Sequence, residues 1–212
     1  MPFGKKNIKA QFLSISLHAR ISHTNRCSQL MWHIQVGIAH QTAVDWYAFI
    51  RDVCSQELLH QPFQLGGPGH TVAIDKTLVA RQKPGNNHSQ AVPPQWCFGA
   101  VDLMTKQIFI QIVPDRSQAT LQLIIQAHIL PGTRVWSDEW RAYFRLDQQL
   151  PHMNYIHGTV NHQQLFADPV TGCQTNNNES RWNACKMCLK RHCGVERNRL
   201  PEFLDEYMWW AL

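Results

Sequence analysis

The chain has 212 residues, of which 44% are hydrophobic, so it is long enough for one full core and a small appendage. Its formal charge of +5 suits a protein that binds polyanions, although many ordinary domains share such a charge. No stretch approaches the roughly 18 apolar residues of a membrane-spanning helix, and the first residues lack the apolar core of a signal peptide. Because the seven cysteines are an odd number, we expect a soluble intracellular protein with reduced thiols, nuclear if the source is eukaryotic and cytoplasmic otherwise.

The first part of the chain is predicted to be helical. Within residues 42–59, helical spacing relates Val44, Tyr47, Ile50/Arg51 and Cys54. The stretch PFQLGGPGH that follows is rich in turn residues and marks a plausible boundary. The predicted domains are therefore a small helical region, 1–65, and a second domain, 66–212.

After this boundary the pattern changes to short apolar strands. Strands are expected at 71–75, 95–103, 107–114, 133–137 and 155–160, the second and third joined by the hairpin turn MTKQ. Helices are expected at 117–130, with Ser117 as the N-cap, then at 139–150, around 175–191 and at 200–210. Three strands followed by alternating helices and strands predict an α/β protein with a mixed sheet covered on both faces. This is the element order of the ribonuclease H-like fold.

Three acids fall in places that suggest chemistry. Asp75 ends the first strand, Asp138 ends the fourth, and Glu179 lies in the first turns of the late helix. Two carboxylates about 4 Å apart repel by roughly 4 kcal/mol at an effective dielectric constant near 20, so such a cluster needs protons or divalent cations. Carboxylate oxygens suit Mg²⁺ or Mn²⁺. The alternative is structural: Ser137 or Asp138 caps a helix that begins near Trp140.

The late helix brings three further side chains to one face. Glu179, Trp182 and Lys186 stand at i, i+3 and i+7. A carboxylate, an aromatic ring and a cation on one groove wall would suit a site that holds a metal ion and a phosphate backbone. The alternative is an amphipathic helix with Trp182 in the core.

Several motifs resemble one known family. The segments VPDRSQATL, ILPGTRVWSDEWRAY and TVNHQQLFADPVTGCQTNNNESRW, with a lysine seven residues after the glutamate, resemble Merlin-type DNA transposases and their bacterial insertion-sequence relatives (ISXO-type). The resemblance covers about residues 71–209, in which the motifs keep the family's order. It implies a DDE-class transposase, which cleaves DNA strands at element ends and joins the freed 3′-hydroxyl to target DNA.

The resemblance also implies roles for particular residues. Asp75, Asp138 and Glu179 would be the catalytic acids and would hold two Mg²⁺ (or Mn²⁺) ions. Lys186, and with it Arg141, would contact DNA phosphates. The partners would be the transposon ends and target DNA, bound by a homo-oligomer away from membranes. The stretch KTLVARQKPGNNH adds Lys76, Arg81 and Lys83 as phosphate contacts, or else it is a charged turn facing solvent.

The chain also departs from the family pattern. Where the family reads I-D-E, this chain reads Ile74-Asp75-Lys76, and strand alternation should turn Lys76 to the face opposite Asp75. An asparagine, Asn178, replaces an apolar residue before Glu179. The N-terminal helix-turn-helix is shortened between GIAHQ and TAVDWY. These departures favour an alternative, a catalytically decayed or host-adopted DNA-binding protein. A ribonuclease H-type nuclease is a further alternative, which the transposase motifs argue against.

Overall fold

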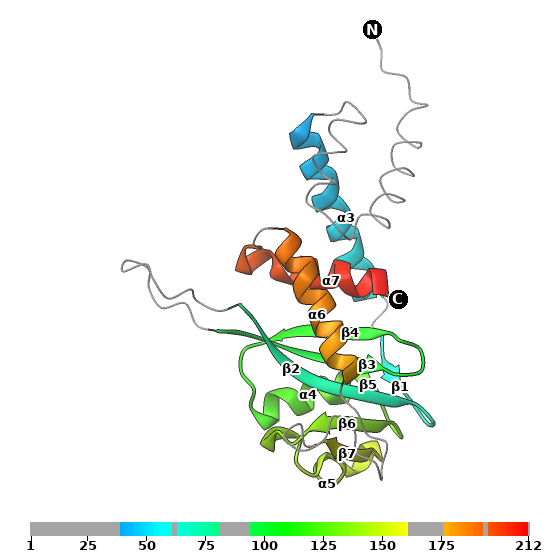
Figure 1. The fold of residues 1–212 in the computed structure, drawn as a ribbon. Helices are drawn as coiled ribbons and strands as arrows, with labels where there is room; N and C mark the ends of the chain where they lie inside the picture. The colour runs from blue at the N-terminus through cyan, green and yellow to red at the C-terminus, as the bar shows by residue number, and fades with distance from the viewer. Residues whose placement is uncertain (1–38, 61–62, 81–93, 161–175, 193–194, 212) are drawn as a thin grey trace, which may run out of the picture.

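The computed structural model describes residues 39–60, 63–80, 94–160, 176–192 and 195–211. Its centre is a five-stranded sheet in the order β4-β3-β2-β6-β7 (Figure 1). The strands are β2 (Thr71–Ala80), β3 (Gln95–Asp102), β4 (Ile108–Val113), β6 (Arg134–Asp138) and β7 (Ile156–Val160). β2, β6 and β7 are parallel, whereas β3 runs antiparallel to both β2 and β4. If the five strands of this sheet are numbered 1 to 5 along the chain, their order across the sheet is 3-2-1-4-5, and strand 2 is antiparallel to the parallel strands 1, 4 and 5. This topology confirms the predicted ribonuclease H-like fold.

The two faces of the sheet are covered by different helices. On one face, Trp182 of α6 (Asn176–Arg191) lies over Gly99 of β3. On the other, His128 of α4 (Gln118–His128) stacks on Phe109 of β4, with ring centroids 3.9 Å apart. Ser117 caps α4 as predicted, because its side chain accepts a hydrogen bond from Thr120 N. The sheet is therefore buried on both sides, which agrees with its nearly continuous apolar strands.

The helix α7 (Leu200–Ala211) packs against β4, an edge strand of the sheet. The backbone N–H of Ile110 in the edge strand β4 points to the Sδ atom of Met208, 3.0 Å away. On its other side, α7 packs against α3 (His40–His60), which extends away from the sheet in Figure 1. Arg51 of α3 is buried there, with its guanidinium over the Phe203 ring and its Nε 3.8 Å from Glu202 Oε2. The edge strand is thus shielded from pairing with another chain.

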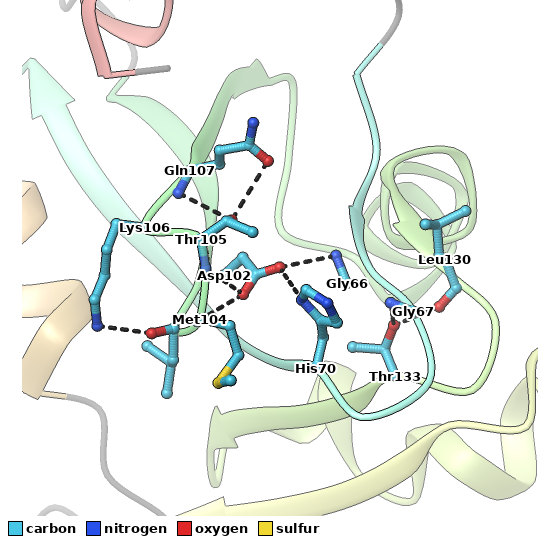
Figure 2. A network of polar contacts seen from close by, with 11 residues as sticks. Gly66, Gly67, His70, Asp102, Met104, Thr105, Lys106, Gln107, Leu130 and Thr133 are labelled. Atoms are coloured by element: carbon cyan, nitrogen blue, oxygen red, sulfur yellow. Dashed lines mark hydrogen bonds and ion pairs between the residues drawn. The ribbon is translucent and has the colours of Figure 1, made fainter.

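A buried carboxylate fixes the end of the sheet at which β2 begins (Figure 2). Asp102 is 1% exposed, and it accepts hydrogen bonds from Met104 N and Gly66 N and from His70 Nδ1. Burial alone would raise the pKa of Asp102, but the hydrogen bonds from Met104 N and His70, with a third from Thr105 N, hold that pKa below its ordinary value. Asp102 therefore ties the β3–β4 hairpin to the Gly66 segment, and its role is structural.

The remaining elements connect these layers. They are β1 (Leu65–Gly66), β5 (Ile129–Leu130), η1 (Arg141–Tyr143), α5 (Leu146–Gln149), η2 (Pro151–Met153) and η3 (Arg197–Arg199). β1 pairs with β5 in a small parallel sheet, so the glycine-rich stretch packs against the core. The division into domains at residue 65 stays a prediction. Among the described residues, no helix has the length and apolar character needed to cross a membrane.

Three sequence expectations need correction. The helix predicted at 139–150 is instead a 3₁₀ turn, η1, followed by the four-residue α5, because Arg145 adopts a left-handed conformation (φ 51°, ψ 49°) where the chain turns. The first strand runs to Ala80 instead of ending at Asp75, so Lys76 belongs to the sheet. In α3 the buried face contains Ala43 instead of Val44, together with Tyr47, Arg51 and Cys54, which the helical spacing had included. The junction at which the helix-turn-helix was predicted to be shortened, between Gln41 and Thr42, lies within α3, and residues 1–38 before it are outside the described residues.

Candidate active site

The two aspartates singled out in the sequence lie on neighbouring parallel strands. The last registered pair between β2 and β6 is Ala73 with Trp136. Asp75 and Asp138 each lie two residues further along their strands. No pair between β2 and β6 is registered beyond this one. This is the position where functional groups gather in α/β sheets.

Asp75 is held from two directions. Its Oδ1 accepts the backbone N–H of Lys76 at 2.7 Å, and its Oδ2 accepts the indole Nε1–H of Trp182 at 3.1 Å. Trp182 reaches this position because Gly99, the partner of Asp75 across β2 and β3, has no side chain. A Cβ at Gly99 would clash with the six-membered ring of the indole. The predicted core position of Trp182 is confirmed, and the ring also orients Asp75.

Asp138 has two described contacts, and its predicted role as a metal ligand stays a prediction. Its Oδ1 accepts the backbone N–H of Trp140, the residue before η1, at 3.2 Å, but η1 has no side-chain cap of its own. Its Oδ2 lies 2.5 Å from the Nζ atom of Lys76, so the same carboxylate carries a close ion pair. Charge-assisted contacts of this kind are shorter and stronger than neutral hydrogen bonds.

The Lys76 ammonium lies inside the protein. The side chain is only 9% exposed, and Nζ lies 4.7 Å from the centroid of the Trp140 ring and 5.6 Å from that of Tyr143. Strand alternation does turn Lys76 away from Asp75, but its four-carbon stem brings the charge to Asp138. Lys76 is therefore directed inward, whereas the sequence indicated a turn that presents it to phosphate.

Tyr143 is fully buried, and the charges of both acids act on it. Its hydroxyl finds no hydrogen-bond partner among the described residues. Burial raises the pKa of Tyr143 well above its ordinary value, and the negative charges of Asp138 and Asp75 raise it further. The charges of both aspartates therefore act on the same buried phenol.

The carboxylate oxygens of Asp75 and Asp138 match the ligands of a divalent cation only in part. Carboxylate oxygens are suitable ligands for Mg²⁺ or Mn²⁺, and two neutral donors, Lys76 N and Trp182 Nε1, orient Asp75. At Asp138, however, the Lys76 ammonium already supplies the positive charge. A cation shared by both carboxylates does not fit until this ion pair opens. Within the described residues, no three His, Cys, Asp or Glu side chains are grouped as metal ligands.

The other predicted site residues are distributed as follows. Glu179 lies in the first turn of α6, and its side chain, like that of Asn178, is outside the described residues. Lys186 is partly buried on α6 and lowers the pKa of Cys97 in β3, against the larger effect of burial, which raises that pKa to about 12. Arg141 is exposed in η1. Arg81 and Lys83 lie outside the described residues.

Arg116 was not predicted as a site residue. Its guanidinium stacks 3.8 Å from the centroid of the Trp96 ring and 4.8 Å from that of Trp140. The rings and cations thus alternate from Trp96 through Arg116 and Trp140 to Lys76. The signal that could have identified Arg116 is its place in the PDRS motif, directly before the cap of α4.

Comparison with known proteins supports the resemblance seen in the sequence. A curated relative, an uncharacterized transposase-like protein of Haemophilus influenzae, is 27% identical over 106 residues, which are 50% of this chain and 81% of the relative. Similar solved structures include the catalytic core of BIV integrase (15% identity, TM-score 0.42, 64% of this chain and 80% of that one). Another is the HTLV-2 integrase catalytic core in complex with magnesium (12% identity, TM-score 0.42, 67% and 85%). The family model of the ISXO2-like transposase domain matches residues 65–211, and the chain therefore belongs to this transposase family.

Proposed function

We propose that the chain is the catalytic domain of a DNA transposase, which cleaves DNA strands at element ends and joins the freed 3′-hydroxyl to target DNA. The observation that carries this proposal is the placement of Asp75 and Asp138 at corresponding positions of two adjacent parallel strands, with α6 crossing above. Glu179, one helical turn before Trp182, is the third acid of the proposed site.

The protein's own groups hold the two described acids in place. Trp182 orients Asp75, and the backbone of Trp140 orients Asp138. The cofactor we propose is Mg²⁺ or Mn²⁺, two ions in the complete site, because hard cations prefer carboxylate oxygens. The enzymatic proposal requires Lys76 to leave Asp138 first.

DNA is the proposed partner, bound by a homo-oligomer that holds element ends and target. Lys186 lies on the same helix as Glu179 and Trp182, and Arg141 follows Asp138 at the surface. Both can reach phosphates around the acids. Arg81 and Lys83 remain proposed contacts from the segment after β2.

A second candidate function is favoured by one observation. The Lys76–Asp138 ion pair neutralises an acid that the enzyme needs for metal binding. A catalytically decayed or host-adopted protein would keep the fold and the DNA-binding surface while this pair replaces the metal ion. Such a protein would bind DNA and would not cleave it.

A strand-cleavage assay separates the two candidates. DNA with candidate inverted repeats is incubated with Mn²⁺ and the unmutated chain, Asp75→Asn, Asp138→Asn or the control Asp45→Asn. Asp45 is an exposed acid on α3. Asp45→Asn therefore removes one negative charge, as the two test variants do, but at a position outside the sheet. The transposase proposal expects cleavage by the unmutated chain and the control, and none by the two other variants. Cleavage that survives in Asp138→Asn, or none in the unmutated chain, contradicts it.

A further inference from the structure

One residue, Lys76, contacts both acids of the candidate site. Its backbone N–H donates to Asp75 Oδ1 at 2.7 Å, and its side-chain ammonium lies 2.5 Å from Asp138 Oδ2. The two acids are far apart in the chain, yet this single residue joins them. It does so with an ammonium group at the carboxylate where the proposed function requires a metal ion.

The Lys76 ammonium is surrounded by one carboxylate and two aromatic rings. Asp138 supplies the opposite charge, and the faces of Trp140 and Tyr143 supply two aromatic walls. We call Asp138, Trp140 and Tyr143 the ammonium cage. Arg116 and Trp96 stack behind Trp140, so this wall is itself supported. The ammonium is therefore a bound cation whose ligand set comes from three positions of one short segment.

We propose that Lys76 is a built-in cation that occupies Asp138 and excludes a divalent ion from this carboxylate until the lysine is displaced. The proposal rests on the proposed role of Asp75 and Asp138, but it does not require that the protein cleave DNA. A divalent ion binding at Asp138 has to break the charge-assisted contact and return the ammonium to water.

Three substitutions at Lys76 separate charge from size. Lys76→Met removes the charge and keeps most of the stem, Lys76→Glu adds a carboxylate, and Lys76→Arg retains a cation. Lys190→Met is the matched control, because Lys190 is an exposed lysine on α6. Lys76→Gln replaces the methionine variant if circular dichroism shows that the latter does not fold.

Binding of Mn²⁺ is measured for each protein without DNA, by quenching of tryptophan fluorescence and by the rise in Tm with Mn²⁺ concentration. We expect Lys76→Met to bind Mn²⁺ about tenfold or more tightly than the unmutated chain, since a tenfold change corresponds to the strength of one charge-assisted contact. Lys76→Glu should bind still more tightly, whereas Lys76→Arg and Lys190→Met should resemble the unmutated chain.

Several results would overturn the inference. Equal Mn²⁺ affinity of the unmutated chain and Lys76→Met would show that Lys76 does not compete with the ion. A failure of both proteins to bind Mn²⁺ would also overturn the inference, because removal of the lysine would then not free a cation site at Asp138. Tighter binding by Lys190→Met as well would show a general charge effect. These outcomes are independent of the cleavage assay. A chain that cleaves DNA but binds Mn²⁺ equally in all variants refutes only the inference. A chain that never cleaves, yet gains Mn²⁺ affinity on loss of Lys76, refutes only the proposed function.

Discussion

The contact between Gly99 and Trp182 can be tested by adding one methyl group. In Gly99→Ala, the new Cβ would overlap the Trp182 ring, which is packed between α6 and the sheet and is only 6% exposed. Overpacking of this kind costs typically 1–3 kcal/mol. For a protein of this size, about 2 kcal/mol lowers Tm by roughly 4–8 °C. The displaced indole should also lose its hydrogen bond to Asp75.

A double-mutant cycle identifies the cause of this loss. Trp182→Phe removes the outer ring atoms that the new methyl group meets, together with the Nε1–H donor. By itself it should cost about 1–3 kcal/mol, because a partly buried carboxylate loses a partner. The double variant should lose less unfolding free energy than the sum of the losses in the two single variants, by at least about 0.5–1 kcal/mol.

The assay is urea unfolding followed by circular dichroism, because fluorescence would change with the loss of a tryptophan. The reasoning is refuted if Gly99→Ala costs less than about 0.5 kcal/mol, which is the range of neutral surface substitutions. Strict additivity in the cycle would also refute it, since the overlap would then not involve the Trp182 ring.

Three further predictions concern the buried carboxylate, the helix cap and the DNA surface. The pKa of Asp102 is lower in the folded chain than the unfolded value of about 3.9, so its stabilising contribution is present above that value and is lost as the pH falls through the folded pKa. In urea unfolding, Asp102→Asn should therefore lose most stability near pH 7, and its difference from the unmutated chain should shrink below about pH 4; a constant difference would contradict this. Ser117→Ala should lower the free energy of unfolding by about 1 kcal/mol, because Thr120 N loses its acceptor, and Ser117→Asn should retain most of it; equal losses in both variants would contradict the cap. If Lys186 contacts a phosphate, Lys186→Ala should reduce the slope of log K against log salt by about one unit and weaken binding to all sequences alike, as measured by fluorescence anisotropy; an unchanged slope would remove Lys186 from the contact surface.

The sequence by itself determined the order of the elements and the family. The apolar runs that became β3, β4, β6 and β7 and the Ser117 cap of α4 are local signals, because hydrophobic period and capping depend on residues only a few positions apart. The family match of residues 65–211 confirms the motif-based resemblance in the same way, since these motifs are continuous segments. The position of Asp138 at the end of β6 follows from the same local patterns, whereas Asp75 lies in the middle of β2.

Only the tertiary structure decided what surrounds the two acids. The pairing of β2 with β6 sets the relation of Asp75 to Asp138, and no local pattern specifies which strands become neighbours. Alternation gave the correct face for Lys76, but it describes the direction of the Cα–Cβ bond and not the reach of a long side chain. The indole of Trp182 meets Asp75 only because a glycine lies opposite it on a different strand. The contacts of a site depend on side-chain reach and on packing between distant segments, and these are properties of the folded chain.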